Sequence, residues 1–180
     1  CRELGADATT PLRVRVGRSP EEMAALAPVG APPPEYAVGV AYPALRLVLL
    51  TLSAPETWDR PDLPAVLTHE LAHVATHRAT AGHGVPRWLD EGIAIHVAGE
   101  RSLERVQVLW EGTVGGRLIT LDDLSDSFPA RPAQVSLAYA ESADFVAWIL
   151  RRSPDGPDKL RAMLGRIGKG PTYVVPLGNR

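Results

Sequence analysis

Residues 62–78 read DLPAVLTHELAHVATHR, a strongly periodic pattern from which the rest of the chain can be interpreted. Its apolar side chains recur every three or four residues, as on one face of an α-helix: Leu63, Val66, Leu67, Leu71 and Val74. Asp62 is a residue type that commonly caps a helix, and Pro64 follows in the first turn, where proline is tolerated. The stretch therefore predicts an amphipathic helix that begins at Asp62 and ends near Arg78.

Within this predicted helix lies the pattern His69-Glu70-Leu71-Ala72-His73. Residues four apart on a helix lie about 6 Å apart along its axis and nearly above one another. Two imidazoles at that spacing can bind one ion with bonds of about 2.0 to 2.1 Å, which suits zinc. Glu70 projects to the side of this face, where it can take a proton from a metal-activated water, so it is the candidate general base. The pattern also arises by chance, so its context must decide.

A second helix follows a glycine-rich turn and supplies candidates for a third metal ligand. It reads Trp88-Leu89-Asp90-Glu91-Gly92-Ile93-Ala94 and is predicted to extend from Arg87 to about Val97. An acid on this helix can return to the ion held by the two histidines and leave the fourth position for water. Asp90 and Glu91 point about 100° apart, so only one of them can face the ion, and Asp90 can instead orient a ligand histidine.

The remaining patterns predict an α+β fold with three strands ahead of the active-site helix and further helices behind it. The strands are expected at residues 12–16, 36–41 and 46–52, with a short helix after the N-cap Ser19. The third strand is nearly all apolar, which is typical of a central strand or of a covered edge. A loop is expected at 112–119 and a single turn at 121–124; helices are expected at residues 103–110, 135–152 and 157–167.

Together these features resemble the gluzincin metallopeptidases of the peptidase MA-like group. The resemblance is carried by His69-Glu70-x-x-His73 followed by Trp88-x-x-Glu91-Gly92-x-Ala94. It extends over roughly residues 12–165, through the strand-helix-strand-strand order and three later patterns: Leu121-x-x-Leu124, Phe128-Pro129 and Tyr139-x-x-Ser142 with Phe145-Val146. The resemblance implies a zincin-like fold, in which a small mixed sheet packs on the active-site helix and the C-terminal part is mostly helical.

The resemblance also implies the members of the site. Glu91 corresponds to the family's third zinc ligand, which completes a set of His69, His73 and Glu91 for one Zn²⁺ per chain. Tyr139 corresponds to a downstream residue that steadies the oxyanion in such enzymes. Related sequences usually continue with more helical material after the last helix, whereas residues 171–176 are expected to be extended.

Length and composition bear on the number of domains, on nucleic-acid binding and on transmembrane segments. The 180 residues suit a single domain, 1–180, with residues 1–11 and 171–180 as peripheral segments. A net charge of −2, with 19 basic and 21 acidic residues and no block of like charge, offers no footprint for nucleic acid. The longest apolar run, residues 47–50, is far shorter than the ~20 residues of a transmembrane segment.

The single cysteine, Cys1, allows no internal disulfide. A mature N-terminal cysteine is typical of a lipid-anchored secreted protein. The resemblance to the family also implies an extracytoplasmic or secreted location. A cytoplasmic location stays open as the alternative, and so does the oligomeric state.

We therefore expect a zinc-dependent metallopeptidase that hydrolyses peptide bonds in a peptide or protein substrate. The strand at residues 46–52 is expected to form the edge of the cleft, to which an extended peptide adds. The alternative is a catalytically weak or latent peptide-binding module on the same fold. Glu70 argues against this alternative, because a protein without turnover has no chemical need of that carboxylate.

Overall fold

The computed structural model describes residues 4, 11–53, 62–100, 103–126 and 132–170. Its three strands are β1 (Arg13–Gly17), β2 (Gly39–Tyr42) and β3 (Leu47–Thr51), in the spatial order β1-β3-β2. β1 pairs with β3 in parallel and β2 pairs with β3 antiparallel. The sheet is therefore small and mixed, as the sequence predicts.

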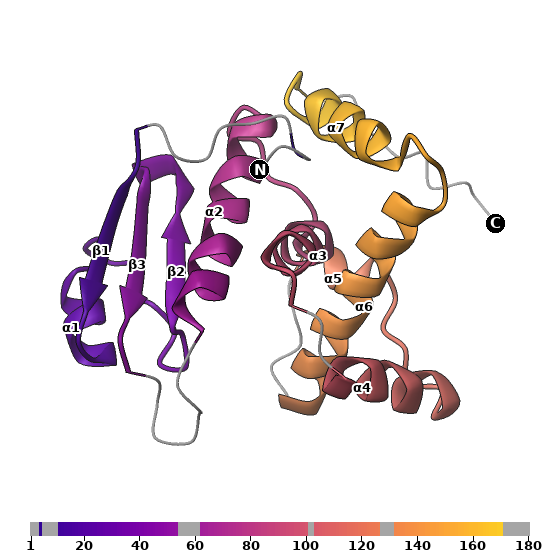
Figure 1. Cartoon of the computed structure of the whole chain (residues 1–180), viewed down its shortest axis with the longest axis horizontal. Helices are drawn as coiled ribbons and strands as arrows, with labels where there is room; N and C mark the ends of the chain where they lie inside the picture. The colour runs from indigo at the N-terminus through magenta and orange to yellow at the C-terminus, as the bar shows by residue number, and fades with distance from the viewer. Residues whose placement is uncertain (1–3, 5–10, 54–61, 101–102, 127–131, 171–180) are drawn as a thin grey trace.

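β3 is the central strand of this sheet, and all five of its residues are buried. The prediction that residues 46–52 form the cleft edge is therefore wrong, because hydrogen bonds to both neighbours occupy both sides of β3. An apolar strand satisfies the sequence pattern of a centre or of a covered edge, and only the pairing distinguishes them. β2 is the edge strand on the side of the helix that carries the His-Glu-x-x-His pattern (Figure 1).

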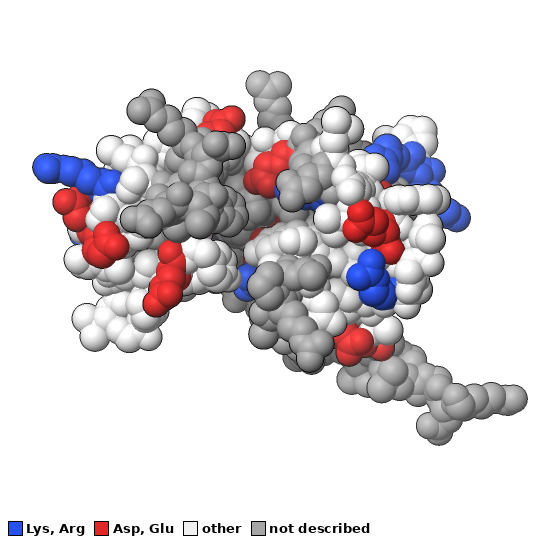
Figure 2. All heavy atoms as spheres, turned by 90° about the horizontal axis from the view of Figure 1, so that it is seen from below, with Lys and Arg blue, Asp and Glu red and all other residues white. Residues whose placement is uncertain are grey.

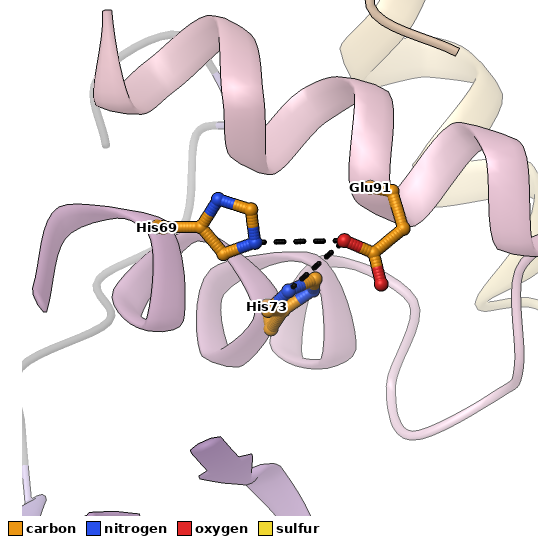
Figure 3. A group of neighbouring side chains, drawn as sticks. All are labelled: His69, His73 and Glu91. Atoms are coloured by element: carbon orange, nitrogen blue, oxygen red, sulfur yellow. Dashed lines mark ion pairs between the residues drawn. The ribbon is translucent and has the colours of Figure 1, made fainter. Parts of the chain in front are cut away.

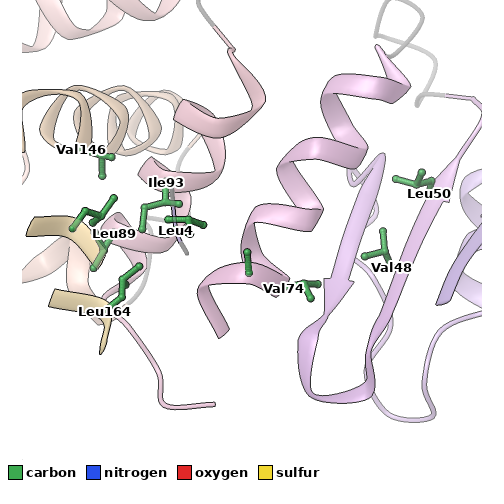
Figure 4. Close-up of a cluster of buried hydrophobic side chains, with 10 residues drawn as sticks. Leu4, Val48, Leu50, Val74, Leu89, Ile93, Val146 and Leu164 are labelled. Atoms are coloured by element: carbon green, nitrogen blue, oxygen red, sulfur yellow. The ribbon is translucent and has the colours of Figure 1, made fainter. Parts of the chain in front are cut away.

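One helix covers each face of the sheet. Successive residues of β3 point to opposite faces, so Leu47 and Leu49 meet Met23 of α1 (Pro20–Ala25). Val48 and Leu50 join the cluster that contains Val74 of α2 (Leu63–Ala79), as Figure 4 shows. Both helices begin as predicted, and the side chain of Asp62 accepts a hydrogen bond from Ala65 N at 3.1 Å. The apolar stripe of α2 thus fixes this helix to the sheet.

The rest of the described chain is helical: α3 (Arg87–Ala98), α4 (Leu103–Val114), α5 (Asp123–Asp126), α6 (Pro132–Arg151) and α7 (Gly156–Ile167). Figure 1 shows this helical part on the far side of α2 from the sheet. α3 lies between α2 and α6, and the main core cluster joins residues of β3, α2, α3, α6 and α7. The predicted α+β arrangement, with a small mixed sheet and a mostly helical C-terminal part, is confirmed.

Two helices are longer than predicted. α4 continues to Val114, through residues expected to be loop, because Gly112 lets the side chain of Leu137 on α6 approach closely. α6 begins at Pro132, three residues before the predicted start, because proline is favoured at the first position of a helix. Phe128-Pro129, Cys1 and the expected extended segment 171–176 lie outside the described residues.

No helix within the described ranges is long and apolar enough to cross a bilayer. Figure 2 shows acidic and basic side chains interspersed on the face that it draws.

Gly92 allows the close contact between α3 and α6. A Cβ built on Gly92 would meet the backbone oxygen of Ser142 and would lie 2.6 Å from Val146 Cγ2. Any larger residue would push α6 away from α3 or force strain into both helices. The glycine of the Glu-Gly-x-Ala pattern is therefore required by packing.

We expect Gly92→Ala to destabilise the protein by about 1–3 kcal/mol, because overpacking outweighs the better helix propensity of alanine. Gly165→Ala is a matched control on α7, since no heavy atom lies within 4 Å of its built Cβ. This control should gain up to about 1 kcal/mol from helix propensity alone. Denaturant unfolding measures both, and a stable Gly92→Ala variant would contradict the packing argument.

Candidate metal centre

Three side chains converge between α2 and α3. His69 and His73 lie one turn apart on α2, and Glu91 lies on the facing side of α3 (Figure 3). Glu91 Oε2 is 3.5 Å from His69 Nε2 and 3.8 Å from His73 Nε2. One donor atom from each residue lies within 4.8 Å of the other two, and such a group can hold a metal ion.

Two of the three donor separations are close to those expected around a zinc ion. Bonds of about 2.1 Å at tetrahedral angles place two ligand atoms about 3.4 Å apart. The two distances between imidazole and carboxylate are close to this value. Two imidazole nitrogens and one carboxylate oxygen are also a donor set that zinc enzymes use, with a fourth position open. The residues present therefore suit the ion that the sequence predicts.

A carboxylate lies close to the outer nitrogen of each imidazole. Glu100 Oε1 is 2.9 Å from His69 Nδ1, and Asp90 Oδ2 is 3.0 Å from His73 Nδ1. A carboxylate against Nδ1 favours a proton there and leaves Nε2 for the metal. The structure thus places Asp90 on the outer side of His73 and Glu91 on its inner side, which agrees with the argument that the two adjacent acids point apart.

Sequence reasoning missed Glu100. It follows Gly99, which ends α3 in the left-handed conformation with φ of 69°. Arg105 holds Glu100 in turn, since Arg105 NH2 lies 3.1 Å from Glu100 Oε2 and its other terminal nitrogen hydrogen-bonds the backbone oxygen of Glu100. No spacing rule links Glu100 to His69, which is 31 positions earlier, so only the tertiary structure reveals this pair.

Arg87 was missed as well. Its NH2 lies 2.9 Å from Glu91 Oε1, one helical turn away. An i, i+4 pair of opposite charges is a signal that the sequence already contained. Burial alone raises the pKa of Glu91, but the hydrogen bond from His69 and the charges of His73 and Arg87 outweigh burial and lower it. Glu91 is therefore held as a carboxylate.

Both histidines have a raised pKa when no metal is bound. Burial alone lowers the pKa of His69, but the hydrogen bonds and charges of Glu100 and Glu91, with the charge of Glu70, raise it to about 10. The pKa of His73 is raised too, because Asp90 opposes the effect of burial. Protons and a metal ion therefore compete for the same two rings.

Glu70 lies beside this group on α2, and only 8% of its surface is exposed. It packs against β2, where a Cβ on Gly39 would lie 3.1 Å from Glu70 Oε1, and it accepts a hydrogen bond from the backbone of Ala41. Burial raises the pKa of Glu70 above its ordinary value, although the charges of His73 and His69 act in the other direction. A carboxylate with a raised pKa is better suited to accept and release a proton near neutral pH.

Tyr139 of α6 reaches the edge of the site. Burial and the nearby charge of Glu91 raise the pKa of Tyr139 to about 12, so its phenol is neutral at physiological pH. It hydrogen-bonds the guanidinium of Arg87. The structure thus brings Tyr139 close to the candidate ligand Glu91 through Arg87.

A cavity of about 250 Å³ opens next to the metal site and shares His73 and Asp90 with it. Its other walls come from the end of α2 and the following turn, including Thr76, His77 and His83. His83 Nδ1 donates to the backbone oxygen of Thr80 at 2.9 Å, since a carbonyl can only accept. The turn that links α2 and α3 therefore forms one wall of a hollow beside the candidate ion.

The comparisons with known proteins agree with this geometry. The model of the Peptidase MA superfamily matches residues 2–177, which is nearly the whole length of the chain. No curated protein and no solved structure gives a significant match. The match spans the sheet, the helix with both histidines and the helices that supply Glu91 and Tyr139. The chain belongs to the Peptidase MA superfamily.

Proposed function

We propose that the chain is a zinc-dependent metallopeptidase that holds one Zn²⁺ and hydrolyses peptide bonds in a peptide or protein substrate. The observation that carries this proposal is the convergence of three donor atoms at separations that suit one four-coordinate ion, with a buried carboxylate, Glu70, next to them. The family supports peptidase chemistry for this arrangement.

The roles of the residues follow from their positions. When bound, zinc polarises the scissile carbonyl and lowers the pKa of a water toward about 7. His69, His73 and Glu91 hold the ion. Glu70 takes a proton from the attacking water and passes it to the leaving amine, a role that its raised pKa favours.

Tyr139 stabilises the oxyanion in this proposal. Its phenol stays protonated at neutral pH and can donate a hydrogen bond. In its hydrogen bond with Arg87 the guanidinium must be the donor, because arginine has no acceptor. In this role the phenolic hydroxyl donates a hydrogen bond to the negative charge that develops on the substrate oxygen.

The substrate binds along β2 in this proposal. β2 is an edge strand next to α2, and Glu70 already accepts a hydrogen bond from the backbone of Ala41. An extended peptide that adds to this edge can pair its backbone groups with those of the strand. Its scissile bond would then lie near the side of α2 that carries the histidines.

We expect Glu70→Gln to abolish hydrolysis of an unfolded protein substrate while one zinc per chain remains bound, because Glu70 moves the proton and does not hold the ion. Elemental analysis and a peptidase assay on the same preparation measure both properties. His73→Ala is the control, since it should lose the zinc as well as the activity.

Turnover by the Glu70→Gln variant would remove Glu70 as the base. A chain that binds zinc but never cleaves a peptide library would instead support the alternative of a latent or weak peptide-binding module. A chain that binds no zinc at all would overturn the proposal.

Tyr139→Phe tests the oxyanion role. We expect kcat to fall about 10²- to 10³-fold, the cost of losing one oxyanion donor, with KM and zinc content nearly unchanged. Thr113→Val is the control that also removes one hydroxyl, since Thr113 Oγ1 donates to Leu109 O within α4 and takes no part in the proposed site. If both variants retain full kcat, Tyr139 is only a packing residue.

We expect the zinc affinity to increase from about pH 6 to about pH 9. The pKa of His69 is about 10 without metal, so zinc must displace its proton throughout this range, and each displaced proton adds up to about tenfold in affinity per pH unit. Calorimetry in buffers of different ionisation enthalpy counts the protons released. Glu100→Gln should weaken the dependence, since it removes the partner that raises this pKa; binding without proton release would contradict the expectation.

A further inference from the structure

Arg87 contacts one side of the candidate ligand Glu91 and leaves the other side open. Its NH2 lies 2.9 Å from Glu91 Oε1, whereas Glu91 Oε2 is the oxygen near both histidines. The two oxygens of the carboxylate are therefore divided between a fixed cation and the metal position. A carboxylate held in this way has one oxygen to offer to an ion.

The same guanidinium also contacts α6. Arg87 donates a hydrogen bond to the phenol of Tyr139, so one side chain joins the third metal ligand to the residue proposed for the oxyanion. The close contact of Gly92 with Ser142 and Val146 holds α6 at the distance that this bridge requires. Arg87 is thus the link between the two helices at the level of the site.

The pair differs from an ordinary surface ion pair. The side chain of Glu91 is only 6% exposed, whereas that of Arg87 is 50% exposed and reaches in from the cavity beside His73. Surface pairs between two exposed side chains contribute little. Removing the partner of a buried carboxylate is costly, because the charge is then left with too few hydrogen bonds. A planar guanidinium can also serve two acceptors at fixed angles, which an ammonium group does poorly.

We propose that Arg87 is a positioning residue that restrains Glu91 to binding the metal through Oε2 alone and holds Tyr139 beside the site. The inference rests on the proposed function for the identity of the ion and for the role of Tyr139. It assigns to Arg87 no direct contact with the substrate or the metal.

Zinc affinity is the first readout, because it does not depend on turnover. Competition with a chelating dye compares the unmodified chain with Arg87→Met, which keeps the length of the side chain, and with Arg87→Lys, which keeps its charge. We expect Arg87→Met to bind zinc about 10- to 100-fold more weakly, the range for lost partners of metal ligands. Arg87→Lys should recover part of this loss. The matched control is Arg151→Met. Arg151 is the last residue of α6, and it pairs with Asp144 of the same helix.

The second readout reports on the coordination itself. Cobalt can replace zinc in such sites, and four-coordinate Co²⁺ absorbs visible light more strongly than five-coordinate Co²⁺. With Arg87 replaced by methionine, Glu91 Oε1 is free to reach the ion, so we expect a weaker cobalt absorption with shifted bands. A variant that is merely less stable would keep the spectrum of the sites that it fills. Far-ultraviolet circular dichroism checks that each variant is folded, and Arg87→Lys continues the test if Arg87→Met is not.

In the peptidase assay, Arg87→Lys should lower kcat by a larger factor than it changes KM. This result would support the link to Tyr139. Unchanged zinc affinity and an unchanged cobalt spectrum in folded Arg87 variants would overturn the positioning role and leave the metallopeptidase proposal intact. An unmodified chain that binds neither zinc nor cobalt would overturn both.

Discussion

The candidate site depends on the close approach of α3 to α2 on one side and to α6 on the other. Glu91 must meet two histidines on α2, and its neighbour Gly92 must let the backbone of α6 come near. Because these residues are adjacent on one helix, α3 can satisfy both contacts only in one position and rotation. The apolar stripe of α2 fixes the other side, since Val74 packs into the same cluster as Val48 of the sheet. Core packing thereby aligns polar groups that come from three helices.

The part of the site that follows from local geometry could be predicted from the sequence. His69 and His73 share one helix, and the helical period alone brings them together. Helical geometry alone could not predict Glu91, because it allows either of the two adjacent acids, Asp90 or Glu91, to face the ion. Only the resemblance to a family favoured Glu91. Glu100 lay outside any such pattern, because its contact with His69 forms only when the end of α3 packs against α2. Arg87 and Glu91 lie four apart on one helix, so the sequence contained their pairing, but an i, i+4 pair does not reveal that Glu91 turns its other oxygen toward the histidines.

The fold shows the same division between local and tertiary information. Alternating or apolar runs located all three strands, and capping residues located the start of α2. The order of the strands was not predictable, since β3 pairs in parallel with a strand more than thirty residues away and antiparallel with its neighbour. The last turn of α4 was not predicted, because the Gly115-Gly116 pair indicated a loop over residues 112–119. The lack of a side chain on Gly112 makes room for Leu137, and this tertiary contact outweighs the poor helix propensity of glycine.

The balance of charge explains why the site suits a divalent cation. Four carboxylates surround the two imidazoles, those of Glu70, Asp90, Glu91 and Glu100, and two guanidinium groups pair with them, those of Arg87 and Arg105. When the carboxylates are ionised and the imidazoles neutral, two negative charges remain, and burying them without compensation is costly. Without a metal, protons on the histidines offset this charge, which is why both pKa values are raised. One divalent cation supplies the same charge at the point where the Nε2 atoms and Glu91 Oε2 converge, so electrostatics and donor geometry favour the same occupant.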